Sequence, residues 1–119
     1  MLSILIVDDE RSVLAGLLRM LSALGYDAVG VSSGAEALRN TLRRRPDIIL
    51  MDIMMPVQNG FEVAREIRKH PHLASVPIIA LTASSNVPPE VQTLFQGVLA
   101  KPCQAAQMRA AIEQVSERR

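Results

Sequence analysis

The chain has 119 residues, 49% of them hydrophobic and only 3% aromatic, which predicts one domain with a core of aliphatic side chains and methionine. Its 13 basic and 12 acidic residues give a net charge of +1, and this balance argues against a nucleic-acid-binding surface. The single cysteine, Cys103, excludes an intrachain disulfide and fits a cytoplasmic protein, and the sequence contains neither a signal peptide nor an apolar run long enough to cross a bilayer.

Short runs of aliphatic and β-branched residues alternate with helical patterns along the whole chain. The runs predict strands near residues 3–7, 27–31, 48–52, 78–81 and 97–100, and the patterns between them predict helices near 10–24, 34–45, 60–69, 88–96 and 104–116. Alternation of this kind is typical of right-handed βαβ units. We therefore expect an α/β fold with a doubly wound parallel sheet and helices on both of its faces.

Several residues mark where the predicted helices begin and end. Gly25 follows the first helix in the position that closes many helices. Ser33 and Glu36 match the capping box that opens a helix. Pro46 and Pro71 end the second and third helices, because the residue before a proline disfavours helical geometry.

The first predicted helix is unusually apolar. Its core-facing side is formed by Leu14, Leu17, Leu18 and Leu21. Three further side chains widen the apolar surface, namely Val13, Met20 and Leu24. Two interpretations follow: either the helix is deeply embedded in the core, or its rim presents an apolar stripe to a partner protein.

Polar side chains follow four of the predicted strands. Asp8 and Asp9 come after the first strand, Asp52 after the third, Thr82 after the fourth and Lys101 after the fifth. Because functional residues of a parallel sheet gather at the carboxyl ends of its strands, we expect one small, charged pocket. Clustered carboxylates repel one another and require a cation, and hard oxygen ligands suit Mg2+. Together with a hydroxyl and a lysine, such a pocket can steady a transferring phosphoryl group.

Each of these residues also has an ordinary structural explanation. Asp9 is a candidate N-cap of the first helix, while Asp52 and Thr82 suit a turn or a cap. Lys101 can simply extend its ammonium group to solvent. For any one residue the structural explanation is favoured, but complementary chemistry at four strand ends favours a functional site.

Four segments carry these residues in a distinctive order: Ile4–Glu10, Asp52–Pro56 with Asn59–Gly60, Leu81–Ala83 and Lys101–Pro102. In order and spacing they resemble the receiver domain of two-component response regulators, across almost the whole chain. The resemblance implies a five-stranded parallel sheet in the order 2-1-3-4-5 with five helices. Residues 1–119 would form one receiver domain, either free-standing or the receiver piece of a longer chain.

The resemblance also implies a role for each acidic residue. Asp52 would accept a phosphoryl group from a phosphohistidine of a sensor histidine kinase or a histidine phosphotransfer domain. Asp9 and Asp52 would bind Mg2+ directly, and Asp8 would act through a water molecule. The backbone carbonyl of Met54 would be a further ligand.

The remaining site residues would act on the phosphoryl group. Thr82 and Lys101 would bond its oxygens, and the peptide bond between Lys101 and Pro102 would be cis. The domain would be a phosphorylatable switch that assists its own phosphotransfer and dephosphorylation, not an enzyme acting on other molecules. The resemblance further implies a monomer or a weak homodimer that contacts neither nucleic acid nor membrane.

Three features depart from the family pattern. Val98 stands where family members often have Tyr or Phe, and Leu94–Phe95 stands where Gly-Ala is common. The segment between Thr82 and Lys101 is short, so the fourth helix should be brief or displaced. These departures argue against a threonine–aromatic coupling, and we expect a switch that works through Thr82 and the loop after it.

Two other functions compete with the receiver interpretation. A phosphatase of the haloacid-dehalogenase type also uses an Asp nucleophile with Mg2+, but it generally has a second Asp two residues later, where this chain has Met54. An interaction module that is never phosphorylated would not need all five polar site residues. In the receiver family, hydrolysis is tuned at the positions of Met54 and Ser84, and the apolar Met54 predicts a long-lived aspartyl phosphate.

Overall fold

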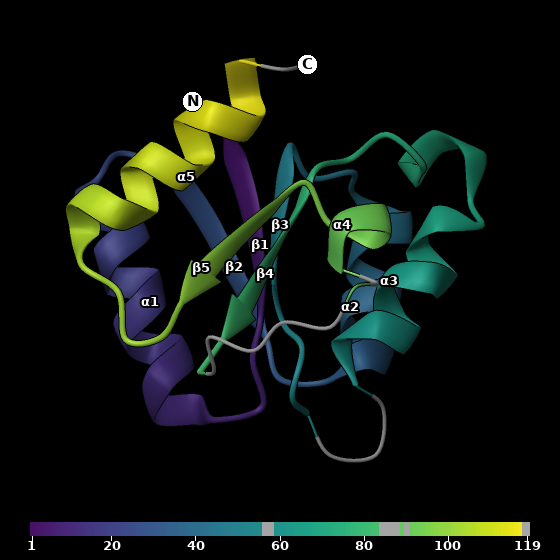
Figure 1. Ribbon diagram of the computed structural model, residues 1–119, viewed down its shortest axis with the longest axis horizontal. Helices are drawn as coiled ribbons and strands as arrows, with labels where there is room; N and C mark the ends of the chain where they lie inside the picture. Colours follow the sequence, from purple (N-terminus) through teal and green to yellow (C-terminus); the bar gives the residue numbers. More distant parts are fainter. Residues whose placement is uncertain (56–58, 84–88, 90, 118–119) are drawn as a thin grey trace.

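The computed structural model of the protein describes residues 1–55, 59–83, 89 and 91–117 (Figure 1). Its elements in chain order are β1 (Ser3–Val7), α1 (Arg11–Ala23), β2 (Asp27–Val31), α2 (Gly34–Arg43), β3 (Ile48–Asp52), α3 (Gly60–Arg68), the 3-10 helix η1 (Pro71–Leu73), β4 (Ile78–Thr82), α4 (Val91–Leu94), β5 (Gly97–Ala100) and α5 (Ala105–Glu117). All the predicted strands and helices are present.

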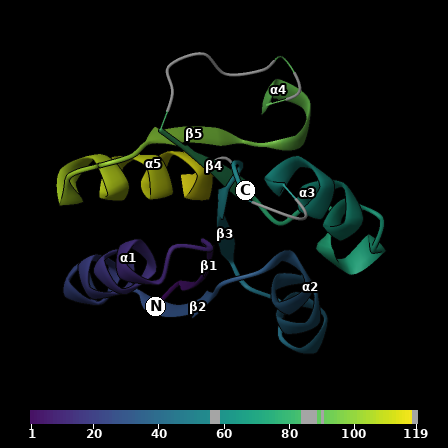
Figure 2. The same cartoon turned by 90° about the horizontal axis from the view of Figure 1, so that it is seen from below.

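The strands form one parallel sheet in the order β2-β1-β3-β4-β5, which confirms the predicted fold. Figure 2 shows α1 and α5 on one face of the sheet and α2 and α3 on the other. The register pairs Asp52 with Leu81 and Thr82 with Ala100. The carboxyl ends of these strands therefore lie at the same edge of the sheet.

The hydrophobic core consists of two layers, one on each face of the sheet. One layer packs the sheet against α2 and α3 and includes Ile67, and the other packs it against α1 and α5 and includes Ile112. Every residue of β3 and β4 is buried, including the polar Asp52 and Thr82 at their ends. Burial of each aliphatic side chain stabilises the fold by roughly 1.5–3 kcal/mol, so the core holds these strand ends firmly in place.

The helix boundaries mostly follow the predicted signals. Gly25 has a φ of 92°, a backbone conformation that suits glycine after a helix. Ser33 caps α2, since its Oγ accepts a hydrogen bond from Glu36 N–H at 3.2 Å. The second bond of a capping box, from the Ser33 N–H to the Glu36 carboxylate, is absent from the described bonds. The Glu36 carboxylate instead accepts bonds from the hydroxyls of Ser33 and the serine before it. A full capping box opens α3 instead, between Asn59 and Glu62.

The start of α1 corrects one prediction. Its N-cap is Glu10, which makes no side-chain capping bond, so the expectation that Asp9 caps the helix is wrong. In the turn before the helix, Asp8 Oδ1 accepts the N–H of Glu10 at 3.0 Å, so it is Asp8 whose side chain bonds the backbone here.

The apolar surface of α1 is mostly packed inside the protein. Leu14, Leu17 and Leu21 are buried. Val13 and Met20, which widen that surface, are partly buried against the same core cluster. This packing favours the interpretation of α1 as a deeply embedded helix.

The fourth helix is brief, as the short segment predicted. It spans only Val91–Leu94, against the predicted range 88–96; residues 84–88 and 90 lie outside the described part of the chain. After it, Phe95 is buried and packs edge-to-face on Phe61 with ring centroids 5.6 Å apart. In the described part of the chain, no helix has the length and apolar character needed to span a bilayer.

Candidate functional site

Three strand ends place carboxylates and an ammonium group in direct contact. Lys101 Nζ lies 3.0 Å from Asp8 Oδ2 and 3.2 Å from Asp52 Oδ2. Oxygen atoms of Asp8, Asp9 and Asp52 all lie within 4.8 Å of one another. The structure therefore brings these side chains together as expected, and the three carboxylates are close enough to share one metal ion.

Backbone hydrogen bonds orient the two buried carboxylates. The N–H of Asp8 donates to Val31 O on the neighbouring strand at 3.1 Å. On β3, Asp52 Oδ1 accepts the N–H of Met54 at 2.9 Å, and the N–H of Ile53 donates to Leu81 O at 3.2 Å. These bonds fix the backbone at the ends of β1 and β3 and turn the Asp52 carboxylate toward Lys101.

Burial and charge act against each other at this site. Asp52 is only 3% exposed, and this burial raises the pKa of its carboxyl, outweighing the opposite effects of Met54 N–H and the Lys101 charge. Burial also favours a neutral Lys101, but bonds and charges from Asp8 and Asp52 outweigh it and raise the pKa of the ammonium group. The ammonium form of Lys101 is therefore favoured, while burial disfavours the anionic form of the Asp52 carboxyl.

Helix α3 begins directly against the end of β3. A Cβ atom on Gly60 would lie 2.5 Å from Asp52 O and 2.7 Å from Ile53 Cα, closer than any real side chain comes. Only glycine permits this approach. The Asn59–Glu62 capping box holds the same helix end, so α3 supports the backbone of Asp52.

Thr82 and Met54 border the carboxylates in different ways. Thr82 is buried at the end of β4, and its carbonyl accepts the N–H of Lys101 at 2.8 Å. The Met54 side chain is 74% exposed. Its carbonyl as a metal ligand stays a prediction, and Pro56 and Ser84 lie outside the described residues.

The end of β5 agrees with the expectations for this strand. The Lys101–Pro102 peptide bond is cis, as the resemblance implied. Val98 is 44% exposed, whereas its neighbour Leu99 is buried. Because β5 has no aromatic residue, Thr82 cannot be coupled to an aromatic ring on this strand. A switch that works through Thr82 and the loop after it stays a prediction.

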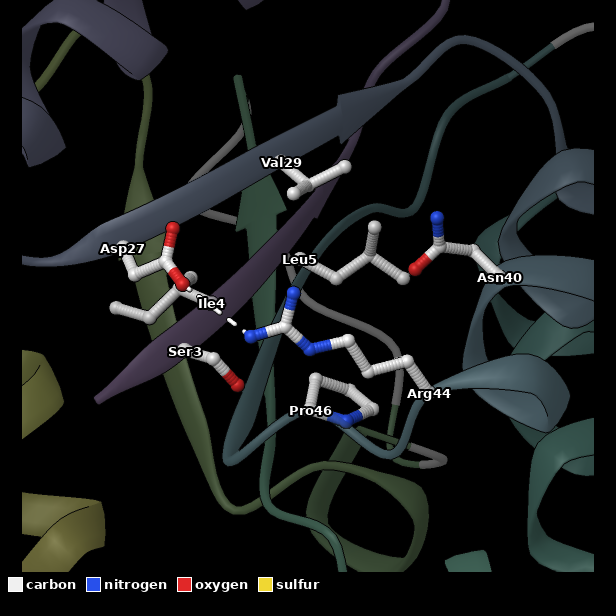
Figure 3. A pocket seen from close by; sticks show the side chains of 8 residues that line it. All are labelled: Ser3, Ile4, Leu5, Asp27, Val29, Asn40, Arg44 and Pro46. Atoms are coloured by element: carbon white, nitrogen blue, oxygen red, sulfur yellow. Dashed lines mark hydrogen bonds and ion pairs between the residues drawn. The ribbon is translucent and has the colours of Figure 1, made fainter. Parts of the chain in front are cut away.

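A hollow at the opposite end of the sheet plays no part in this site. It lies between β1, β2 and α2, where Arg44 reaches over the strands toward Asp27, 3.4 Å away (Figure 3). Its volume of about 20 Å³ leaves room for roughly one water molecule. An organic ligand is too large for it. Arg44 itself is exposed.

Two residues that sequence analysis did not single out connect the sheet to α4. Arg68 and Gln96 hydrogen-bond each other at 2.6 Å across 28 residues of chain. A single sequence contains no local signal for such a pair, because neither residue belongs to a motif or a strand end.

A doubly wound parallel sheet with carboxylates, a threonine and a lysine at its strand ends defines a class of phosphoacceptor signalling domains. The family model described as "Response regulator receiver domain" matches residues 4–113. The chain belongs to this family, whose members act in two-component signal transduction and are phosphorylated on an aspartate.

Curated relatives agree with this assignment. The chain is 39% identical over 119 residues to the transcriptional regulatory protein PrrA of Mycobacterium leprae, covering 98% of this chain and 50% of the relative. It is 40% identical over 118 residues to the probable transcriptional regulator ycf27 of Guillardia theta, covering 97% and 45%. The chain thus spans about half the length of the curated relatives it matches.

Solved structures show the same fold. The receiver domain of sensor histidine kinase PA1611 from Pseudomonas aeruginosa matches with a TM-score of 0.89 and 34% identity, covering 98% of each chain, and has a magnesium ion coordinated in its active-site cleft. Chemotaxis protein CheY4 of Vibrio cholerae matches with a TM-score of 0.88 and 29% identity, covering 97% of this chain and 98% of that one.

Proposed function

We propose that Asp52 is the phosphoacceptor of this receiver domain and takes its phosphoryl group from a phosphohistidine of a sensor histidine kinase or a histidine phosphotransfer domain. The observation that carries this proposal is the position of Asp52 at a buried strand end, held by the amide of Met54 and contacted by Lys101. Asp8 shares the same lysine, but one of its oxygens also accepts the Glu10 N–H at the start of α1.

The proposed reaction is a displacement at phosphorus. A carboxylate oxygen of Asp52 forms the new P–O bond while the bond between phosphorus and the histidine nitrogen breaks, and the imidazole keeps the electron pair. Donor and acceptor are both anionic, so a fixed positive charge is needed between them. Lys101 supplies that charge, and the Thr82 hydroxyl is the proposed partner of a phosphoryl oxygen.

We also propose that this site binds Mg2+ through Asp9 and Asp52 directly, Asp8 through water, and the carbonyl of Met54. The donor set fits, because three carboxylates whose oxygens lie within 4.8 Å supply the hard ligands that Mg2+ prefers. When bound, Mg2+ supplies positive charge that lowers the repulsion between the donor phosphoryl group and Asp52.

A phosphatase of the haloacid-dehalogenase type remains the competing function. The residue two positions after Asp52 is Met54, whose exposed thioether cannot donate or accept a proton as an acid would. This favours a stable aspartyl phosphate over turnover of a phosphomonoester.

The partner surface proposed here lies between the end of α1 and α5. An open hollow of about 400 Å³ there is lined by Leu24, Ala105, Ala106, Arg109, Ala110 and Glu113. Its small apolar floor and charged margins suit a helix of the phosphodonor. Leu24 lies toward the amino ends of the strands, so the donor must also extend along α1 to reach Asp52 at the carboxyl end of β3. Because Val13 and Met20 pack on the core, the docking residues are sought on α5.

Phosphorylation of Asp52 is tested with a small phosphodonor and Mg2+. We expect one hydroxylamine-labile phosphoryl group per chain and none in Asp52→Asn. Label at full level in this variant, or continuous release of phosphate from a phosphomonoester, would contradict the proposal.

The docking surface is tested with a protein donor. Ala106→Glu should slow transfer from a phosphorylated histidine phosphotransfer domain and leave labelling by the small phosphodonor unchanged. Ala35→Glu, at an exposed alanine of α2, is the matched control. Equal slowing in both variants would place docking elsewhere.

Three further expectations stay predictions. They are the single-domain boundary at 1–119, the monomeric or weakly dimeric state and the cytoplasmic location.

A further inference from the structure

The register of β5 is poorly defined by its own side chains. β5 is an edge strand of four residues, and only Leu99 among them is buried. Gly97 has no side chain, and Val98 is 44% exposed. Short strands with glycine and few buried side chains specify their register weakly. Something else must determine how β5 lies on β4.

Gln96, the residue before β5, makes two bonds to the first residue of β4. Its N–H donates to Ile78 O at 2.8 Å, and its side-chain Oε1 accepts the N–H of Ile78 at 2.8 Å. Both main-chain polar groups of Ile78 are thereby bonded to one residue. This arrangement fits only the observed register, in which Ile79 lies opposite Gly97.

Arg68 at the end of α3 holds Gln96 in this position. Its Nη2 donates to Gln96 Oε1 at 2.6 Å and to Leu94 O at 3.1 Å. Its Nη1 donates to Val76 O at 2.6 Å, just before β4. The planar guanidinium therefore joins the end of α4, Gln96 and the approach to β4 in one rigid unit.

Lys101 lies at the other end of the same two strands. Its N–H donates to Thr82 O at 2.8 Å, and its ammonium group contacts Asp8 and Asp52. A slip of β5 by one residue would move Lys101 about 3.3 Å along the sheet and turn its side chain to the opposite face.

We propose that Gln96, held by Arg68, is a positioning residue: it sets the register of β5 on β4 and thereby places the Lys101 ammonium between Asp8 and Asp52. This inference rests on the proposed function of Asp52 and Lys101. It gives Arg68 and Gln96 a role in phosphoryl transfer although neither residue touches the reacting atoms.

The test compares two substitutions of similar size. Gln96→Met removes the acceptor oxygen, whereas Gln96→Glu keeps it for both Ile78 and Arg68. We expect Gln96→Met to slow labelling by acetyl phosphate at saturating Mg2+ on the order of tenfold or more, since small misplacements of a reacting group have effects of that size. Gln96→Glu should retain the parent rate within about twofold.

Two further measurements separate positioning from general damage. Mg2+ affinity, measured by calorimetry, should not fall in Gln96→Met, because the metal ligands belong to β1, β3 and the residues after them and a displaced ammonium group repels the metal less. Amide hydrogen exchange should become faster at Ile78 and at Lys101. If Gln96→Met does not fold, Arg68→Lys is used instead. This variant keeps Gln96 and the positive charge, but a lysine cannot donate to Val76 O, Leu94 O and Gln96 Oε1 together.

The inference is overturned if Gln96→Met is labelled at the parent rate, if Gln96→Glu is as slow as Gln96→Met, or if Mg2+ affinity falls in step with labelling. Arg68→Lys with the parent rate and a protected Lys101 amide would overturn it as well. A parent protein that accepts no phosphoryl group would instead contradict the proposed function. In that case, the role of Gln96 in the register is decided by amide hydrogen exchange at Lys101, which should be faster in Gln96→Met than in the parent protein.

Discussion

The ammonium nitrogen of Lys101 lies 3.2 Å from Asp52 Oδ2, although 49 residues separate the two in the chain. The same nitrogen contacts Asp8, which is completely buried. One cation thus offsets two buried anions. Removing the cation leaves both anions without compensation, whereas neutralising one anion leaves the cation with a partner, so the two kinds of substitution should have opposite effects.

Removal of the lysine should destabilise the protein when Mg2+ is absent. Lys101→Met leaves Asp8 and Asp52 without their cation, and breaking a buried ion pair in this way costs about 3 kcal/mol. Urea unfolding in a chelator measures the loss. Lys69→Met removes the exposed pair with Glu66 and should cost less than about 1 kcal/mol. Equal losses in the two variants would contradict the central role of Lys101.

Neutralising the proposed phosphoacceptor should have the opposite effect. Burial raises the pKa of Asp52 above its ordinary value of 3.8, so the folded state binds this proton more tightly than the unfolded state. The stability that Asp52 contributes is therefore fully present below about pH 3.8 and is lost as pH rises through the raised pKa.

Asp52→Asn does not titrate and avoids this loss. At pH 7 without Mg2+ it should be more stable than the parent. The difference should shrink as the pH falls toward 4. Urea midpoints at several pH values measure it, and a variant less stable than the parent at pH 7 would show that the Lys101 contact outweighs burial.

Mg2+ should stabilise the parent protein. A ligand that binds only the folded state adds about 2.7 kcal/mol at 100 times its dissociation constant. Asp9→Ala should lose most of the resulting rise in melting temperature, because Asp9 is a proposed direct ligand but makes no capping bond that the fold needs. A rise of equal size in both proteins would place the metal at another site.

Gly60 should be intolerant of any side chain. Gly60→Ala puts a Cβ 2.5 Å from Asp52 O, so α3 or the end of β3 must move. We expect a loss of about 1–3 kcal/mol and slower labelling of Asp52. Gly16→Ala, in α1, meets no atom closer than 4.0 Å and should instead stabilise by about 0.5–1 kcal/mol. Unchanged labelling in Gly60→Ala would show that α3 does not support the site.

The lifetime of the aspartyl phosphate should depend on Met54. Its exposed, apolar side chain cannot orient an attacking water, whereas an amide or a carboxylate can. Met54→Asn and Met54→Glu should therefore shorten the lifetime, by roughly tenfold or more for the potential general base. Decay of isolated phosphoprotein measures the effect, with Leu42→Asn, at an exposed site on α2, as control. Parent lifetimes in both Met54 variants would exclude this position as a control point.

Much of the fold could be predicted because its signals are local. The continuous apolar runs of β3 and β4 indicate strands buried on both faces, and their periodicity needs no knowledge of distant residues. The failed prediction for Asp9 also concerns local geometry: either of two adjacent aspartates can accept an amide at the start of α1, and the sequence does not say which one does.

The sequence by itself determined which residues end the strands, and the topology of a parallel sheet implied that Asp8, Asp52 and Lys101 would share one edge. Only the tertiary structure decided that one ammonium group lies between two carboxylates, that Gly60 fits against Asp52, and that Arg68 and Gln96 hold the start of β5. These contacts join residues far apart in the chain. They depend on packing to within an ångström, whereas sequence patterns specify periodicity and order but not such distances.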